Sequence, residues 1–168
     1  MKRDRVLANM VIGANGATSL HQDSAPLSPP ADRRRFHEIR DLSRALVVGG
    51  NTFRREHYAN APIPVYVATR TATPQFSGAT FIVAAPEEVV ESALDESGGP
   101  VLIEGGISFI TPLIEKMMID RFFITRSPIS GDGDFFDFDN LNQHYKCDKS
   151  LDVDNVTFEE WIPKVARG

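Results

Sequence analysis

The sequence contains two stretches in which a short apolar run is followed at once by two glycines and then by a helical pattern. The first is ALVVGG at residues 45–50, and the second is VLIEGG at residues 101–106, followed by ISFITPLIE. A buried strand that turns through glycines into a helix is the βα unit of a parallel sheet. Both turns are therefore expected at the carboxyl edge of one α/β sheet, where such sheets bind ligands.

A single Gly-Gly pair is more often a simple strand-to-helix turn than a binding site. Adjacent glycines also let a ligand approach the peptide groups closely, and the N–H groups that begin the next helix favour an anion such as a phosphate. Because the pattern occurs twice on strands expected to be parallel, the sequence favours a phosphate-bearing ligand at this edge.

Other apolar and periodic segments complete an α/β pattern. Strands are expected at residues 5–12, 63–68, 80–84 and 119–125, and a last, antiparallel strand at 153–161. Helices are expected at residues 29–42 with Ser28 as N-cap, at 52–59, at 86–97 and after Gly106. Pro112 means that this last helix either starts near the proline or is kinked there. The segment FFDFDNLN (135–142) reads as short and irregular, and the polar loop at 19–30 is long enough to be functional.

Composition narrows the classes of function. With 168 residues, the chain is expected to form one domain over residues 1–168. Its net charge of −5 argues against binding nucleic acid, and no apolar run approaches the length of a membrane span. The single cysteine, Cys147, leaves no internal disulfide or cysteine cluster for a metal. These features predict a cytoplasmic protein with no metal and no membrane or nucleic-acid partner.

Positive charge is concentrated in the N-terminal third. Residues 1–55 contain ten lysines and arginines against five acidic residues. This asymmetry suits a small anionic ligand, although scattered surface charge explains it equally well. The three consecutive arginines at 33–35 more often form a solvated helix face than a site. Arg40, nearer the end of that helix, is the better candidate for a ligand contact.

Several motifs resemble one known family in their order and spacing. They are LANMVIGANGATS, LSPPADRRRFHEIR, ALVVGGNTFRRE, VYVATR, LIEGGISFITPLI and MIDRFFITRSPISGDG, which together cover about residues 5–130. The chain resembles the reductase domain at the C-terminus of bifunctional riboflavin-biosynthesis deaminase-reductases. That resemblance implies a dihydrofolate-reductase-like three-layer fold, with a twisted, mostly parallel sheet, helices on both faces and an antiparallel C-terminal strand. No H-x-E and P-C-x-x-C zinc motif of the deaminase half is present.

The resemblance also implies an activity and a set of site residues. It implies an NADPH-dependent oxidoreductase of riboflavin biosynthesis, which reduces the ribosyl chain of 5-amino-6-(5-phosphoribosylamino)uracil to a ribityl chain, and it implies a homodimer. Asn15 and Glu104 are the expected catalytic residues, and Ser24, Arg40 and Glu104 the expected contacts to this small phosphorylated heterocyclic substrate. The residues expected to bind the cofactor are Thr52, Thr69, Arg70, Gly105, Gly106, Ile107, Ser108 and Phe109.

The chain also departs from the family pattern. Family members commonly have S-L-D-G where this chain has GANG (13–16), so the amide of Asn15 replaces an acid. The family's N-P-x-L-x-x-R segment has no clear counterpart in EHYANAPIPV, so a second arginine for the substrate phosphate is missing. Two alternatives therefore stay open: a dihydrofolate-reductase-like paralogue that reduces a pterin or another heterocycle, and a non-catalytic NADPH-binding protein.

Overall fold

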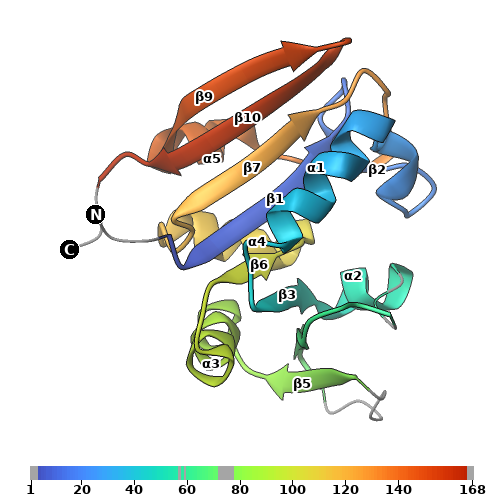
Figure 1. Cartoon of the computed structure of the whole chain (residues 1–168). Coiled ribbons are helices and arrows are strands. Elements are labelled where there is room, and N and C mark those ends of the chain that lie inside the picture. The colour runs from blue at the N-terminus through green and yellow to red at the C-terminus, as the bar shows by residue number, and fades with distance from the viewer. Residues whose placement is uncertain (1–3, 57, 59, 72–77, 166–168) are drawn as a thin grey trace.

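A computed structural model describes residues 4–56, 58, 60–71 and 78–165. Its centre is an eight-stranded sheet with the order β5-β4-β3-β6-β1-β7-β10-β9 (Figure 1). The strands from β5 to β7 in this order are parallel to one another, whereas β10 pairs with both β7 and β9 in antiparallel fashion. The predicted α/β fold class, with a mostly parallel sheet and antiparallel C-terminal strand, is confirmed.

The elements follow one another along the chain in a largely alternating order. The strands are β1 (Val6–Ile12), β2 (Ala17–Ser19), β3 (Ala45–Gly49), β4 (Val65–Thr69), β5 (Ala79–Val83), β6 (Val101–Ile103), β7 (Arg121–Arg126), β8 (Gly133–Phe135), β9 (Tyr145–Val153) and β10 (Val156–Pro163). The helices are α1 (Pro30–Arg40), α2 (Gly50–Arg55), α3 (Pro86–Ser97), α4 (Ile107–Glu115) and α5 (Phe138–His144), preceded by a short 3₁₀ turn, η1 (Ala25–Leu27).

Two hydrophobic cores lie on opposite faces of the sheet, because parallel strands must be covered on both faces. Side chains of α3, α4 and α5 pack with the sheet in the larger core. The smaller core joins the other face to α1 and to the segment around α2, through residues such as Ile39, Phe53 and Tyr58. In Figure 1, α1 crosses in front of β1 and β7, whereas α3 packs below β6.

The C-terminal third contains two elements that the sequence did not reveal. Residues 138–144 form α5, whose N-cap Asp137 accepts a hydrogen bond from the N–H of Asn140 at 3.0 Å. Strand β9 is exposed along its whole length after Tyr145, so it lacks the apolar pattern that reveals a strand. The predicted strand at 153–161 is β10, which pairs with both β7 and β9.

Smaller differences concern helix boundaries and turns. Pro29, not Ser28, is the N-cap of α1, and the Ser28 hydroxyl instead donates to Asp32 at 2.5 Å. Helix α2 is shorter than predicted, and His57 and Ala59 of the predicted helix lie outside the described residues. Helix α4 begins at Ile107, and Pro112 lies inside it.

A second, two-stranded sheet joins the loop after β1 to the loop after β7. Strands β2 and β8 pair in antiparallel fashion, with Ala17 opposite Phe135. Within the described residues, no helix is long and apolar enough to cross a membrane. The same described ranges contain no group of three or more His, Cys, Asp or Glu side chains arranged to hold a metal ion.

Candidate active site

The two glycine turns meet at the carboxyl edge of the sheet, because β3 and β6 are adjacent parallel strands. The N–H of Gly49 donates to the carbonyl of Gly105 at 3.1 Å. A Cβ atom on Gly106 would lie 2.8 Å from the Thr52 hydroxyl oxygen, closer than real Cβ atoms approach such an atom. The Gly105–Gly106 peptide bond is cis, and Gly105 has a φ of +97°. The positive φ therefore favours glycine at position 105, and a side chain at position 106 would have to displace the Thr52 hydroxyl.

The start of α4 carries three of the residues predicted to bind the cofactor. Ile107 is half-buried and Ser108 is exposed, whereas the Phe109 side chain packs in the larger core. Because the first N–H groups of a helix have no acceptor inside the helix, those of Ile107 and Ser108 remain for another partner. Phe109 therefore contributes packing, and any polar contact from this turn comes from the backbone or from the Ser108 hydroxyl.

Thr69 is the last residue of β4 and Arg70 follows it, and β4 lies on the other side of β3 from β6. Thr69 is buried, and its hydroxyl donates to the carbonyl of Thr71 at 2.8 Å. Arg70 is exposed, and in the described part of the chain no acidic side chain pairs with it. Its guanidinium is therefore available to bind an anion at the carboxyl end of β4.

Arg40 and Glu104 form a two-pronged ion pair. The Arg40 Nε and Nη2 atoms donate to the two Glu104 carboxylate oxygens at 2.6 and 2.7 Å. Only 4% of the Glu104 side chain and 17% of the Arg40 side chain are exposed. The guanidinium also lies 4.3 Å from the centre of the Phe36 ring. Arg40, at the end of helix α1, therefore places its guanidinium against the carboxylate of Glu104, the residue immediately before Gly105.

The electrostatics of this pair reflect both burial and attraction. Burial raises the pKa of Glu104, against the lowering effect of Arg40. Burial alone would lower the pKa of Arg40, but the hydrogen bonds and charge of Glu104 raise it overall. The short two-pronged geometry is that of an ionised carboxylate with a guanidinium. The pair is thus charged, desolvated and oriented.

Two further acceptor and donor groups adjoin this pair. The Ser24 hydroxyl donates to Glu56, and the Tyr58 hydroxyl lies 3.5 Å from the other Glu56 oxygen. Burial and the charges of Glu104 and Glu56 raise the pKa of Tyr58 well above its ordinary value, so its phenol stays protonated. The five residues Ser24, Arg40, Glu56, Tyr58 and Glu104 are called the Arg40 cluster below.

Asn15 lies apart from the Arg40 cluster in its hydrogen bonding. Its amide nitrogen donates to the Gly131 carbonyl at 2.8 Å, and its amide oxygen accepts from the Gly131 N–H at 3.0 Å. The side chain thus ties the turn after β1 to the loop after β7. The structure brings together Ser24, Arg40 and Glu104 of the predicted substrate contacts and gives Asn15 two backbone partners elsewhere.

Glu56 and Tyr58 are members of the cluster that the sequence did not single out. They follow α2 in the segment that has no counterpart in the family pattern, and nothing in their spacing marks them. Asp32 was also missed: it is buried, and it accepts hydrogen bonds from Ser28 and Thr125 hydroxyls at 2.5 Å each. The signal available for Asp32 was an acid in the first turn of a helix, which is more often an exposed residue.

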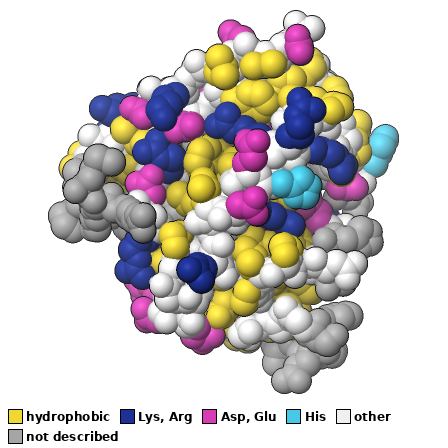
Figure 2. All heavy atoms as spheres, in the orientation of Figure 1, with side chains coloured by type: hydrophobic (Ala, Val, Ile, Leu, Met, Phe, Trp, Pro, Cys, Tyr) yellow, Lys and Arg dark blue, Asp and Glu magenta, His cyan; other side chains and the backbone are white. Residues whose placement is uncertain are grey.

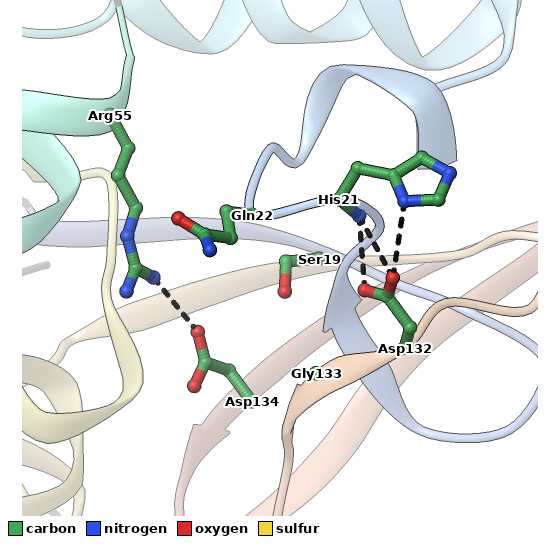
Figure 3. A pocket seen from close by; sticks show the side chains of 7 residues that line it. All are labelled: Ser19, His21, Gln22, Arg55, Asp132, Gly133 and Asp134. Atoms are coloured by element: carbon green, nitrogen blue, oxygen red, sulfur yellow. Dashed lines mark hydrogen bonds and ion pairs between the residues drawn. The ribbon is translucent and has the colours of Figure 1, made fainter.

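A surface hollow of about 550 Å³ lies between the turn after β2 and the start of β8. Figure 3 shows its walls: the turn at 19–22, the end of α2 and strand β8. Two ion pairs span them, Arg55 with Asp134 at 3.2 Å and His21 with Asp132 at 3.4 Å. Arg55 directly precedes Glu56 of the Arg40 cluster in the chain, but none of the five residues of the cluster lines the hollow.

The fold and these glycine turns agree with a family match. Residues 5–156 match the family described as the RibD C-terminal domain. The chain therefore belongs to the RibD C-terminal domain family. The family comprises reductase domains of riboflavin biosynthesis, so the protein is an oxidoreductase of that riboflavin-pathway or dihydrofolate-reductase-like type. No curated protein sequence matches the chain significantly.

Solved structures show the same fold at low sequence identity. A pyrimidine reductase-like protein of Corynebacterium diphtheriae is 15% identical, with a TM-score of 0.76 and coverage of 97% of this chain and 93% of that one. Dihydrofolate reductase from Enterococcus faecalis, complexed with NADP(H) and RAB-propyl, is 19% identical, with a TM-score of 0.75 and coverage of 96% and 97%. A putative riboflavin biosynthesis protein of Shewanella sp. PV-4 is 19% identical, with a TM-score of 0.74 and coverage of 96% and 99%.

Proposed function

We propose that this protein is an NADPH-dependent reductase that transfers hydride to a pyrimidine carrying a ribosylamino chain. The reference substrate is 5-amino-6-(5-phosphoribosylamino)uracil, which the family resemblance implies. The observation that carries the proposal is the direct succession of Glu104, Gly105 and Gly106 at the end of β6. A substrate held by the Glu104 carboxylate lies beside any ligand held against the glycines, which is the arrangement that hydride transfer requires.

The residues at the sheet edge fit a nicotinamide dinucleotide. The glycine turns carry no side chain of their own, and at Gly106 this leaves room for the Thr52 hydroxyl to lie against the backbone, 2.8 Å from where a Cβ atom would be. The N–H groups of Ile107 and Ser108 suit a pyrophosphate, and Arg70, with which no acidic side chain of the described residues pairs, suits a 2′-phosphate. When bound, the nicotinamide supplies the hydride, and the protein supplies binding and alignment.

The Arg40 cluster supplies the substrate side of the proposed reaction. The Glu104 carboxylate accepts hydrogen bonds from ring N–H groups or sugar hydroxyls, and Arg40 keeps that carboxylate ionised and oriented. The Ser24 hydroxyl, beside Glu56, adds a donor and acceptor for the sugar chain. The proposal includes a homodimer and a cytoplasmic location, both as family expectations.

The test is oxidation of NADPH by the purified protein in the presence of 5-amino-6-(5-phosphoribosylamino)uracil, with dihydrofolate in a parallel assay. We expect turnover of the pyrimidine, and a loss of about 100-fold in kcat/KM in Glu104→Gln, the size reported for single polar groups aimed at a reacting ligand. Gly106→Val should lose cofactor binding, since its side chain would collide with Thr52, a residue proposed to bind the cofactor, and displace it. A protein that binds NADPH and oxidises it with neither substrate would be a non-catalytic binder, and the proposal would be wrong.

A further inference from the structure

Arg40 is the cation of the cluster, and its guanidinium group is already bound to Glu104. Both of its hydrogen-bonding prongs reach Glu104, at 2.6 and 2.7 Å, and the Phe36 ring lies against the guanidinium. A phosphate ester could accept hydrogen bonds from the same two nitrogen atoms of Arg40 only by displacing the Glu104 carboxylate. That exchange would leave Glu104, which is 4% exposed, without its counter-charge. An unpaired buried charge is strongly unfavourable, so the exchange is opposed.

The cluster as a whole also has the wrong sign for a phosphate. Among its described residues, two carboxylates outnumber the one guanidinium. Both carboxylates act on the same space, because the charges of Glu104 and Glu56 each raise the pKa of the buried Tyr58. A phosphate dianion that entered here would meet this excess of negative charge in a region of low dielectric constant, where repulsion is strong.

The basic side chains that line the hollow already have acidic partners. Arg55 at the end of α2 pairs with Asp134, and His21 pairs with Asp132 across the hollow (Figure 3). Figure 2 shows the face covered by α1, where basic and acidic side chains alternate with apolar ones and no field of one sign forms. Arg33 and His37 are exposed on α1, so they face solvent rather than the buried carboxylate.

We propose that this site recognises the unphosphorylated part of its substrate: a heterocycle rich in N–H and O–H groups, from which Glu104 and Glu56 accept hydrogen bonds, with no anchor for a phosphate group among the residues of the site that the structure describes. The inference rests on the proposed reductase function and specifies its substrate class. It assigns Arg40 to the positioning of Glu104. Tyr58 is buried and protonated, and its hydroxyl adds a donor within reach of Glu56.

The first test compares the phosphorylated pyrimidine with its dephosphorylated form, prepared by phosphatase treatment, on the wild-type protein. A phosphate held by an arginine fork raises kcat/KM by about 10- to 100-fold, the value of a charge-assisted hydrogen bond. We expect the phosphorylated form to be no better than the dephosphorylated form, and inorganic phosphate not to inhibit competitively. A tenfold or larger preference for the phosphorylated form would overturn the inference.

Variants identify the reason for that result. Glu104→Gln removes the competing carboxylate and should make the protein prefer the phosphorylated compound, because the Arg40 fork becomes free. Arg40→Ala should lower kcat/KM for both compounds by the same factor while the Kd of NADPH stays unchanged. The matched control is Arg33→Ala, an exposed arginine of the same helix, which should change neither value. A preference for phosphate in the wild type that either arginine variant abolishes would contradict the proposal.

Failure of the reductase proposal is distinguishable from failure of this inference. If NADPH binds but is not oxidised, the reductase function is wrong, and the two pyrimidines are then compared by isothermal titration calorimetry. Equal or weaker binding of the phosphorylated form supports the inference, and tighter binding overturns it. If neither compound binds, the Arg40 cluster is not a pyrimidine site and both proposals fail. Should Glu104→Gln not fold, the wild-type comparison still decides.

Discussion

Glu104 is a carboxylate that water hardly reaches, and it depends on Arg40 to remain charged there. Burial raises its pKa, and the two hydrogen bonds from Arg40 act against that rise. Removing one partner of a buried pair typically costs about 3–5 kcal/mol, because the other charge is left uncompensated. Loss of activity in Arg40 or Glu104 variants therefore has meaning only alongside their measured stability.

Asn15 gives the clearest prediction about a single side chain. Its amide both donates to and accepts from the backbone of Gly131. Asn15→Asp keeps the acceptor but replaces the donor with an oxygen that faces the Gly131 carbonyl. We expect a loss of about 1–2 kcal/mol in the free energy of unfolding, the typical cost of one hydrogen bond plus local repulsion. Urea denaturation at neutral pH measures it.

The control for Asn15→Asp is Gln143→Glu, which makes the same change from amide to carboxylate at an exposed position of α5. This control should change stability by less than about 0.5 kcal/mol, as surface substitutions usually do. An Asn15→Asp protein as stable as the wild type would mean that the contact with Gly131 does not hold the two loops together. The catalytic role expected for Asn15 stays a prediction.

Elements with a strong apolar pattern were predictable from the sequence, and elements that depend on their partners were not. Strands β3 and β6, each of which leads into a Gly-Gly turn, can be recognised in the sequence because buried parallel strands are continuous apolar runs. Strand β9 reads YKCDKSLDV and carries no such run, since it is an edge strand with one buried residue. Pairing with β10, not local preference, makes it a strand.

The residues of the candidate site likewise fall into two groups, those that the sequence indicated and those that it did not. Ser24, Arg40 and Glu104 were named because they fall in motifs that resemble a family. Glu56 and Tyr58 lie in a segment with no motif, and only the tertiary structure brings them to Glu104. Side-chain partners separated by 32 residues, such as Ser24 and Glu56, cannot be read from local spacing.

Tyr145, the first residue of β9, is hydrogen-bonded to the turn before β7, and the contribution of this contact to stability can be tested. Its buried hydroxyl accepts from the Ile119 N–H at 3.1 Å and donates to the Ile119 carbonyl at 3.0 Å. Tyr145→Phe would leave two buried backbone groups without this partner, at a cost of about 1–3 kcal/mol. We expect a lower denaturant midpoint with an unchanged m-value.

Tyr66→Phe is the matched control for this substitution. The Tyr66 hydroxyl donates to a Glu96 oxygen at 2.9 Å in a part-buried position, and its loss leaves no backbone group unpaired. Its cost should be clearly smaller than that of Tyr145→Phe. Equal costs in the two variants would show that the double contact with Ile119 adds nothing to the docking of β9.

The sheet order brings both halves of the proposed site to one edge. The residues assigned to the cofactor follow β3, β4 and β6, whose order in the sheet is β4-β3-β6. The Arg40 cluster reaches the same edge from α1, from the segment after α2 and from the end of β6. Because β6 contributes to both halves, a ligand on either side contacts the same strand end. Binding of a cofactor should therefore stabilise the central sheet as a whole.

This coupling gives a prediction for the intact protein. A ligand at 100 times its Kd stabilises the folded state by about 2.7 kcal/mol. For a chain of 168 residues, that corresponds to a rise of about 5–10 °C in Tm. NADH at the same concentration should raise Tm by less than about half as much, because it lacks the 2′-phosphate that Arg70 is proposed to bind and should bind about 10- to 100-fold more weakly. Thermal unfolding with each cofactor measures both shifts.

Arg70→Ala should reduce the NADPH shift to the NADH value. The control is Arg34→Ala, which changes an exposed arginine on α1 and should leave the NADPH shift as it is. Equal shifts with NADPH and NADH in the wild type would remove Arg70 from the site.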